Sequence, residues 1–182
     1  MKVITLDIDG VLNNYPFCWL DYIELQQNKK FNSLTEAKEG LGQEVYSQIK
    51  ESYRTSGYKG TLPVNPIAAD FTKLLKQKGY KIIVSTSRPF HLYPNLEKLT
   101  FDWLKYSQIT FDCLEKKSEQ LLIKYPDILF HVDDELDHTI FFLEKNINVF
   151  ILRRKDINYE GYEKYKSLRF VESLNDVLAY VD

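Results

Sequence analysis

A short hydrophobic run at the start of the chain ends in acidic residues, and a second run near residue 130 ends in the same way. Residues 3–6 read Val-Ile-Thr-Leu and lead into Asp-Ile-Asp-Gly at 7–10, whereas residues 128–132 lead into two aspartates at 133–134. Short runs of this kind are typical of strands buried on both faces of a parallel sheet. Because ligands bind beyond the carboxyl ends of such strands, the acidic residues predict a site at that edge of the sheet.

The rest of the chain alternates between strand and helix patterns. Further strands are expected at 81–86, 109–114 and 149–152, and helices are expected at 67–75, about 99–104, 118–125, 139–145 and 174–181. Such alternation predicts an α/β fold with a parallel central sheet built through right-handed crossovers.

The stretch between the first two expected strands has a different pattern. Ser33 and Glu36 have the spacing of a capping box that opens a helix, and a second helix is expected after the glycines at 40 and 42. Prolines at 63 and 66 close the stretch. We therefore expect two parts: a core of residues 1–12 and 66–182, and a small helical cap of residues 13–65.

Composition places the chain among ordinary globular domains. Its 182 residues suit one domain with a small insertion, and 44% hydrophobic residues are enough for a core without disulfides. A net charge of −2 provides no global basic field for non-specific nucleic-acid binding. Neither a signal peptide nor an apolar run of membrane-spanning length is visible, so we expect a cytoplasmic protein with no membrane partner.

Four carboxylates, those of Asp7, Asp9, Asp133 and Asp134, are expected to crowd one pocket. Like charges repel strongly where the dielectric constant is low. A small cavity with hard oxygen ligands suits Mg²⁺, which offsets the repulsion and screens an incoming phosphate dianion. The sequence therefore predicts a magnesium site.

The same residue types suit phosphoryl transfer through a covalent intermediate. A carboxylate at a strand end can attack phosphorus, and a second carboxylate two residues later can protonate the leaving alkoxide and then deprotonate water. Gly10 would let the backbone turn tightly beside the phosphate. Thr86 offers a hydroxyl, and a lysine offers a positive charge, to the phosphoryl oxygens.

Four segments together resemble the motifs of the haloacid dehalogenase (HAD) superfamily. Residues 7–12, Asp-Ile-Asp-Gly-Val-Leu, resemble the first motif, and the run 82–86 that ends in threonine resembles the second. Lys116 or Lys117 matches the third, a lysine leading into a helix, and residues 130–134 match the fourth. The motifs occur in order over nearly the whole chain, which implies a three-layer Rossmann-like α/β fold with a small helical cap.

The resemblance implies roles for the acidic residues. Asp7 would be the nucleophile and a magnesium ligand, and Asp9 would be the general acid and base and would bind magnesium through its backbone carbonyl. Asp134 would be the acidic metal ligand, with Asp133 as a further ligand or its support. HAD dehalogenases usually lack the second acid of the first motif, so Asp9 favours phosphoryl transfer over dehalogenation.

The resemblance also implies a phosphate-binding side of the site. Thr86 would hydrogen-bond the phosphoryl group, and a lysine would neutralise it. Lys117 is preferred to Lys116 because it directly precedes the expected helix. Arg88 is interpreted as a residue that reaches a substrate phosphate, with Ser87 beside it, the alternative being a pair between Arg88 and a surface acid.

Other polar residues have structural interpretations. His131 lies in an expected core strand and is interpreted as a satisfied buried histidine. Arg153, Arg154 and Lys155 are interpreted as a solvated strand end. For Asp137, support of the metal site and capping of the next helix are equally good interpretations.

Aromatic residues at the start of the expected cap point to the substrate. Tyr15 and Phe17 follow Asp7 closely, and rings at a pocket mouth can stack on a nucleobase, although they can equally form the core of the cap. Residues 7–12 with Tyr15 and the short cap resemble 5′(3′)-deoxyribonucleotidases. Residues 86–88 and 99–104 with the acidic pair resemble the phosphatase domain of polynucleotide kinases.

These features predict a Mg²⁺-dependent hydrolase that acts on a small phosphomonoester, and a nucleotide is the preferred candidate substrate. The alternatives are a phosphatase acting on nucleic-acid 3′ ends and a phosphatase acting on sugar phosphates or other metabolites. A nucleotide-binding module without turnover is the non-enzymatic alternative, and the complete set of motif residues argues against it.

Overall fold

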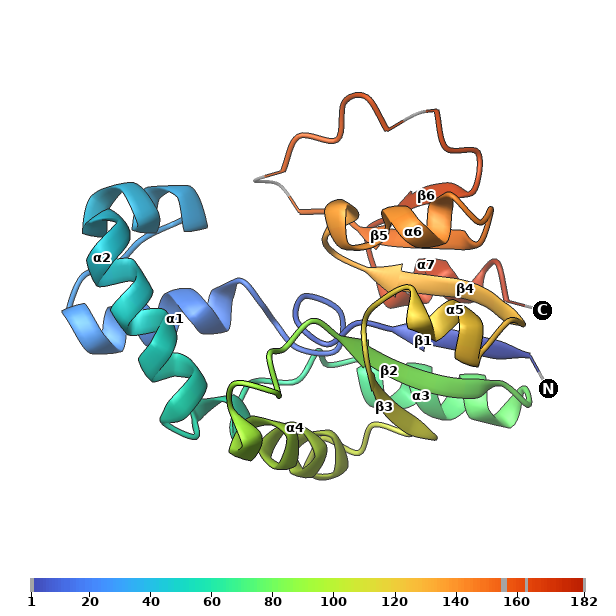
Figure 1. Cartoon of the computed structure of the whole chain (residues 1–182), viewed down its shortest axis with the longest axis horizontal. Coiled ribbons are helices and arrows are strands. Elements are labelled where there is room, and N and C mark those ends of the chain that lie inside the picture. The colour runs from blue at the N-terminus through green and yellow to red at the C-terminus, as the bar shows by residue number, and fades with distance from the viewer. Residues whose placement is uncertain (1, 155–156, 163, 182) are drawn as a thin grey trace.

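The computed structural model describes residues 2–154, 157–162 and 164–181. Within these residues, six strands form one parallel sheet in the order β3-β2-β1-β4-β5-β6 (Figure 1). The strands are β1 (Val3–Leu6), β2 (Lys81–Thr86), β3 (Cys113–Lys116), β4 (Ile128–Asp133), β5 (Asn148–Leu152) and β6 (Leu168–Val171). The expectation of an α/β fold with a parallel central sheet is confirmed.

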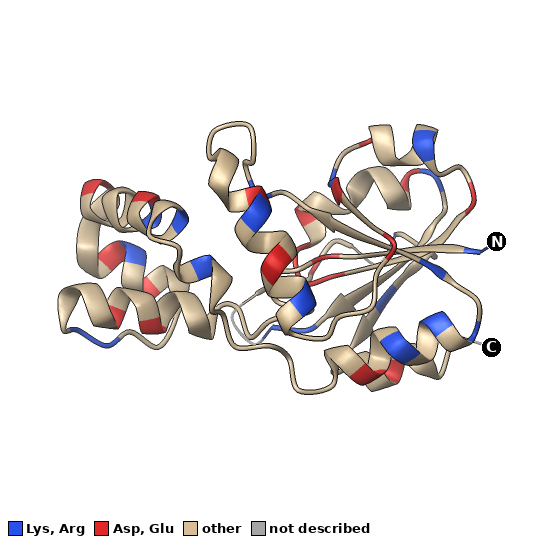
Figure 2. Ribbon diagram, turned by 90° about the horizontal axis from the view of Figure 1, so that it is seen from below, with Lys and Arg blue, Asp and Glu red and all other residues tan. Residues whose placement is uncertain are grey.

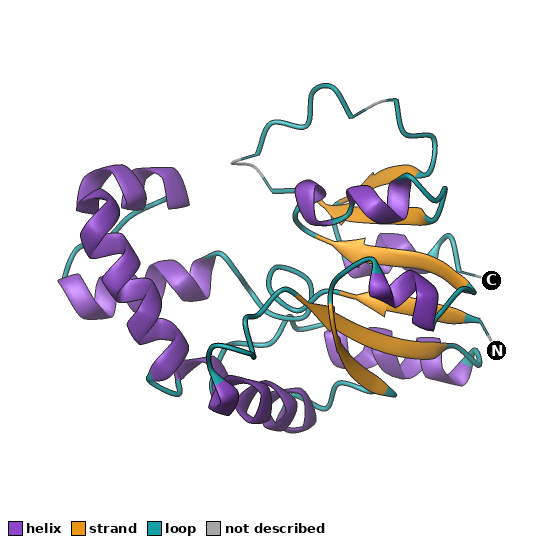
Figure 3. Ribbon diagram, in the orientation of Figure 1, coloured by secondary structure: helices purple, strands orange, loops and turns teal. Residues whose placement is uncertain are grey.

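Helices cover both faces of the sheet and complete three layers (Figure 3). One face carries α3 (Ala68–Gln77), α4 (Pro94–Tyr106) and α7 (Leu174–Leu178), which contribute Phe71, Trp103 and Val177 among others to one core cluster. The other carries α5 (Gln120–Lys124), the 3₁₀ helix η2 (Leu136–His138) and α6 (Ile140–Leu143), whose side chains belong to a second cluster.

The strands explain why there are two clusters. Along β2, Ile82 and Val84 pack into the first cluster and Ile83 into the second; along β5, Phe150 and Ile151 divide in the same way. Successive side chains of a strand point to opposite faces, so a run that is apolar at every position needs cover on both sides.

The strand order creates a crevice at the carboxyl edge of β1. The chain moves from β1 to β2 and β3 in one direction, whereas β4, β5 and β6 lie on the other side of β1. In open α/β sheets, ligands bind where the strand order reverses in this manner. Asp7 follows β1, Asp133 ends β4 and Thr86 ends β2, so all three lie at this edge.

A separate group of helices lies beyond that edge, at the far end of the molecule from both termini (Figure 1). It comprises α1 (Phe17–Gln27), α2 (Leu34–Thr55) and the 3₁₀ helix η1 (Tyr58–Gly60). The chain enters and leaves the group through paired backbone, because Asn13 and Val64 form an antiparallel bridge. Packed rings, Trp19, Tyr22, Tyr53 and Tyr58 among them, form its interior.

Local sequence signals predicted the helix boundaries unevenly. Gly42 has φ 75° and breaks α2, as the glycine pair suggested, and Ser33 caps that helix by accepting from Glu36 N. A capping box opens α7 at Ser173. Several helices are displaced or shorter than expected; α6, for example, covers only Ile140–Leu143.

Two strands differ from expectation. The third strand was predicted at 109–114, but β3 runs from Cys113 to Lys116, because its register with β2 pairs Thr86 with Lys116. Ile109 is instead buried in the first core cluster. The edge strand β6 was not predicted, since the exposed Arg169 interrupts its short apolar run and only Val171 of its four residues is fully buried. None of the described helices has the length and apolar character that a bilayer span requires.

Candidate active site

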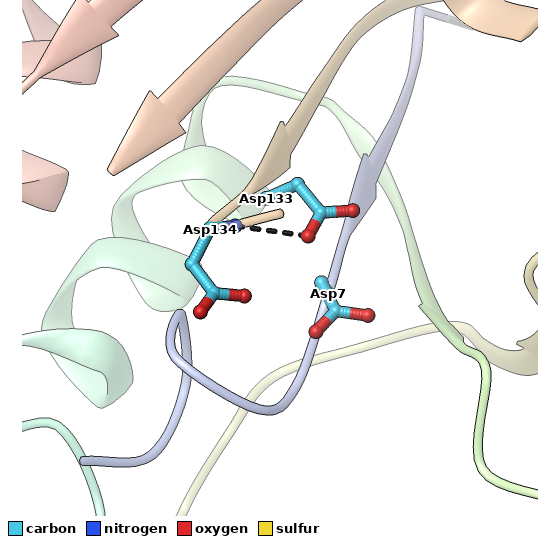
Figure 4. Close-up of side chains that lie close together, drawn as sticks. All are labelled: Asp7, Asp133 and Asp134. Carbon is cyan, nitrogen blue, oxygen red and sulfur yellow. Dashed lines mark hydrogen bonds between the residues drawn. The ribbon is translucent and has the colours of Figure 1, made fainter. Parts of the chain in front are cut away.

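Lys117 holds together two buried carboxylates at the crevice. Its Nζ lies 2.7 Å from Asp7 Oδ1 and 2.6 Å from Asp133 Oδ2, and its side chain is only 2% exposed. Asp7, Asp133 and Asp134 can place one oxygen each within 4.8 Å of one another (Figure 4). Burial raises the pKa of Asp7 to about 7, and the charge of Lys117 opposes this shift.

A chain of hydrogen bonds that runs through His131 to Thr5 holds the Asp133 carboxylate in place. Its Oδ2 lies 2.8 Å from His131 Nε2, and His131 Nδ1 lies 2.8 Å from Thr5 Oγ1. Its Oδ1 accepts from the backbone N–H groups of Asp134 and Glu135. Burial alone would raise the pKa of Asp133, but Lys117 and His131 outweigh burial and hold that pKa well below its usual range. His131 is therefore structural, as interpreted, and its structural role is to orient a site residue.

Asp134 is held by an arginine and a glycine. Arg154 Nη1 lies 3.0 Å from Asp134 Oδ2, and the arginine also approaches Glu135. On the other side, a Cβ added to Gly10 would lie 2.2 Å from Asp134 Cγ, and Gly10 has φ +83°. Burial, followed by the charges of Asp133 and Asp7, raises the pKa of Asp134 well above its usual range.

The three carboxylates fit a divalent cation. Lys117 pairs with Asp7 and Asp133, and Arg154 pairs with Asp134, so two cations face three buried acids and negative charge remains in excess. The donor set consists of carboxylate oxygens, which Mg²⁺ prefers. Of the four carboxylates predicted to crowd one pocket, Asp7, Asp133 and Asp134 thus lie together and fit a magnesium ion, whereas the Asp9 carboxylate pairs with other cations.

Asp9 lies in a second charged cluster at the mouth of the crevice. Arg88 donates two hydrogen bonds to its carboxylate, at 3.0 and 2.7 Å, and Lys59 Nζ lies 3.3 Å away. Asn13 donates a further bond at 2.8 Å. Burial would raise the pKa of Asp9, but Arg88 and Lys59 reverse that effect and hold it well below its usual range. Asp9 is therefore ionised in this arrangement.

A cavity of about 290 Å³ connects the two clusters. Thr86 and Ser87 line it, and the backbone N–H of Lys117 donates to Thr86 O, which ties the ends of β2 and β3 together. The described lining residues are Asp7, Asp9, Tyr15, Trp19, Lys50, Tyr53, Arg54, Lys59, Thr86, Ser87, Arg88, Pro89, Leu96, Lys117, Asp133, Asp134, Glu135 and His138.

The structure brings most predicted site residues together, with exceptions. Phe17 does not reach this cavity: its side chain is 64% exposed and lines a separate hollow, because α1 turns that position outward. Gly10 contacts Asp134 without lining the cavity. Lys116 is exposed, whereas Lys117 is buried in the site. Asp137 lies within η2 and accepts from the Tyr162 hydroxyl, outside the cavity lining.

Sequence reasoning missed several cations. Arg154 was interpreted as part of a solvated strand end, yet it pairs with Asp134; Lys155 lies outside the described residues. Lys59, Lys50 and Arg54 come from the helical group and line the cavity, although no motif marks them. Lys50 and Arg54 lie on α2 and Lys59 lies on η1, so only the way these helices pack beside the crevice distinguishes the three residues from solvated ones.

No family model and no curated protein sequence matches the chain. Solved structures match over its full length, among them CbbY from Rhodobacter sphaeroides in complex with xylulose-(1,5)bisphosphate. That match has 14% identity and a TM-score of 0.66, and covers 100% of this chain and 99% of that chain. The L-2-haloacid dehalogenase RSc1362 matches with 11% identity and a TM-score of 0.61, covering 100% and 98%.

The chain has the haloacid dehalogenase fold. A structure of the Pnkp1/Rnl/Hen1 complex has a similar part: 18% identity, a TM-score of 0.53, and coverage of 86% of this chain and 46% of that chain. At these identities the likeness establishes the fold, which confirms the resemblance inferred from the four motifs. The chemistry has to be argued from the HAD-fold crevice itself.

We predict that Lys117→Gln lowers the free energy of unfolding by about 3–5 kcal/mol at neutral pH, because it leaves two buried carboxylates without their shared cation. The neighbouring Lys116→Gln is the matched control, and its exposed side chain predicts a change within about 0.5 kcal/mol. Urea denaturation measures both. Adding Asp7→Asn to Lys117→Gln should recover part of the loss, and equal effects of the two lysine variants would contradict this account.

Gly10→Ala should destabilise the fold more than Gly79→Ala. Both glycines have a positive φ, +83° and +84°, so each variant carries a left-handed backbone cost of about 1–2 kcal/mol. Only at Gly10 does the new methyl group meet another residue, Asp134, which adds an overpacking cost of about 1–3 kcal/mol. Thermal or urea unfolding of the two variants measures the difference in stability. Equal losses of stability would mean that Asp134 moves aside without cost.

Proposed function

We propose that this protein is a Mg²⁺-dependent phosphomonoester hydrolase that forms an aspartyl-phosphate on Asp7. The observation that supports this most is the joint placement of Asp7, Lys117, Asp133 and Asp134 in the HAD-fold crevice, with Asp9 at its mouth. A nucleophilic carboxylate, a fixed cation and an acidic metal site are together the parts that phosphoryl transfer needs.

In the first step, a carboxylate oxygen of Asp7 attacks phosphorus, and the bond between phosphorus and the alcohol oxygen breaks. Asp9 gives a proton to the departing alkoxide, which leaves as the alcohol. Lys117 and Thr86, both on the cavity wall, hold the phosphoryl oxygens while negative charge moves onto them. To act as an acid, Asp9 must first gain a proton from solvent and give up its bonds with Arg88 and Lys59. An incoming phosphate dianion offers these two cations another anionic partner.

In the second step, water attacks the phosphorus of the aspartyl-phosphate. Asp9 takes a proton from that water, the bond between phosphorus and the Asp7 oxygen breaks, and inorganic phosphate leaves. The carboxylate of Asp7 is regenerated. Arg88 and Lys59 favour the ionised form of Asp9, and this ionised carboxylate is the form that can accept the proton from water.

Asp7, Asp134 and the backbone carbonyl of Asp9 would hold the magnesium ion, with Asp133 fixed beside them by Lys117 and His131. When bound, Mg²⁺ supplies positive charge that neutralises the phosphate and the crowded acids. The same charge favours the ionised form of Asp7, which the attack on phosphorus requires.

We further propose that residues 13–65 act as a cap that selects the substrate. Tyr15, Trp19 and Tyr53 from this segment line the cavity opposite the catalytic aspartates, which supports a nucleotide monophosphate with its base against the rings. The Lys and Arg positions are interspersed with the Asp and Glu positions along the ribbon (Figure 2), and the net charge of the chain is −2. A long polynucleotide would need several backbone contacts, so a mononucleotide is favoured over a polymer.

A sugar phosphate is the second candidate. Trp19 and Tyr53 are only 2% and 4% exposed, and their faces pack against other rings of the cap, which leaves less aromatic surface for a base. The CbbY structure of the same fold holds a sugar bisphosphate. A binding module without turnover is the non-enzymatic candidate, and measured phosphate release would reject it.

Asp7→Asn is expected to abolish phosphate release from p-nitrophenyl phosphate, because the amide cannot attack phosphorus. Asp70→Asn, the same change on exposed α3, should leave the rate unaltered. For the unmodified chain, excess EDTA should stop the reaction and added Mg²⁺ should restore it. Substantial turnover by a clean Asp7→Asn preparation, or full activity in EDTA, would refute the mechanism.

Tyr15→Ala should lower kcat/KM for deoxynucleoside 5′- and 3′-monophosphates by about tenfold or more, the size of one base–aromatic stacking contact. The rate with p-nitrophenyl phosphate, which lacks a base, should change much less. Phe17→Ala is the control, because Phe17 lies outside the cavity. If sugar phosphates are hydrolysed faster than every nucleotide, the sugar-phosphate candidate replaces the nucleotide one.

A further inference from the structure

The walls of the cavity differ in charge. All of its described acidic residues, Asp7 and Asp9 among them, come from the core, whereas the charged residues that the cap contributes are all cations: Lys50, Arg54 and Lys59. Lys50 and Arg54 lie four residues apart on α2, so they project from the same side of that helix, one turn apart.

Most cations of the cavity already have a carboxylate partner. Lys117 binds Asp7 and Asp133, and Arg88 and Lys59 bind Asp9. Lys50 and Arg54 differ: across residues 2–154, 157–162 and 164–181, neither has a carboxylate oxygen within 4.0 Å.

The surroundings of Arg54 hold it in place beside the cavity. Its guanidinium lies 5.7 Å from the centre of the Tyr93 ring, and the Tyr93 hydroxyl donates to Glu51 on the same helix. Stacking of this kind restricts the side chain but leaves its N–H donors available. Lys50 is accessible to solvent beside the cavity, and the partial loss of its hydration there, with the charge of Arg54, lowers its pKa. Two like charges one turn apart repel each other and destabilise the helix, and an anion bound between them would remove this repulsion.

We propose that Lys50 and Arg54 bind a second phosphate on the organic part of the substrate, so that the preferred substrate is a small molecule carrying two phosphates. The inference rests on the proposed function for the placement of the first phosphate at Asp7. Two cations match the charge of one phosphate dianion. The arginine fork and the lysine ammonium are both phosphate ligands, and they line the same cavity as Asp7 from a different segment of the chain.

Binding to the Asp7→Asn variant in Mg²⁺ tests the subsite without turnover. Isothermal titration compares thymidine 3′,5′-bisphosphate with thymidine 5′-monophosphate, and glucose 1,6-bisphosphate with glucose 6-phosphate. In at least one pair, we expect the bisphosphate to bind about tenfold tighter or more, as charge-assisted contacts predict. The pair that shows the preference identifies the organic part.

Variants of the cap cations locate the effect. Lys50→Gln and Arg54→Gln, each added to Asp7→Asn, should reduce the preference for the bisphosphate about tenfold, and the double change should abolish it. Lys38→Gln removes the same charge from the same helix outside the cavity and should preserve the preference. The swap of Lys50→Arg with Arg54→Lys keeps both charges and should retain most of it.

Equal binding of mono- and bisphosphates in both pairs would overturn the proposal before any cap variant is made. So would a preference that survives the loss of both cations, or one that Lys38→Gln reduces equally. Phosphate release by the unmodified chain from p-nitrophenyl phosphate tests the proposed function separately. A chain that releases phosphate but shows no binding preference lacks the subsite, whereas one that prefers bisphosphates without releasing phosphate has the subsite and lacks the activity.

Discussion

The cost of burying three carboxylates in one crevice governs this structure. Asp7, Asp133 and Asp134 are each at most 5% exposed, and desolvation of such groups costs several kcal/mol per ion unless a counter-charge lies close. Lys117 supplies that charge between Asp7 and Asp133, and the register of β3 against β2 is what brings its backbone to Thr86. The remaining excess of negative charge makes the crevice a site for a cation.

A second charged cluster connects the carboxyl edge of the sheet to the helical group of α1, α2 and η1, which is the proposed cap. Arg88 from the loop after β2 and Lys59 from η1 meet at Asp9, although 29 residues separate the two cations. Arg88 also donates to Thr100 on α4, so the cluster joins four parts of the chain. Because one carboxylate is shared between core and cap, the position of the cap and the charge state of Asp9 depend on each other.

The fold alone leaves the chemistry open. Structures of the same fold, at 11 to 18% identity, include a dehalogenase, a protein bound to a sugar bisphosphate and part of a Pnkp1/Rnl/Hen1 complex. A fold of this kind provides a crevice where the strand order reverses, and it does not fix the reaction carried out there. For this chain, the phosphatase proposal therefore depends on the side chains in that crevice, and the substrate depends on what the cap places opposite them.

The sequence by itself determined a parallel sheet, although without β6 and with other bounds for β3, and it determined the edge of that sheet on which the acids lie. An apolar run followed by acids is a local pattern, so Asp7, Asp9 and the pair Asp133 and Asp134 could be assigned to strand ends without coordinates. Only the tertiary structure paired Arg154 with Asp134 and Lys59 with Asp9, and directed Lys50 and Arg54 into the cavity while Phe17 faces outward. The physical reason is that an ion pair between distant segments has no periodicity in the sequence, since it depends on how a helix packs rather than on which residues form it.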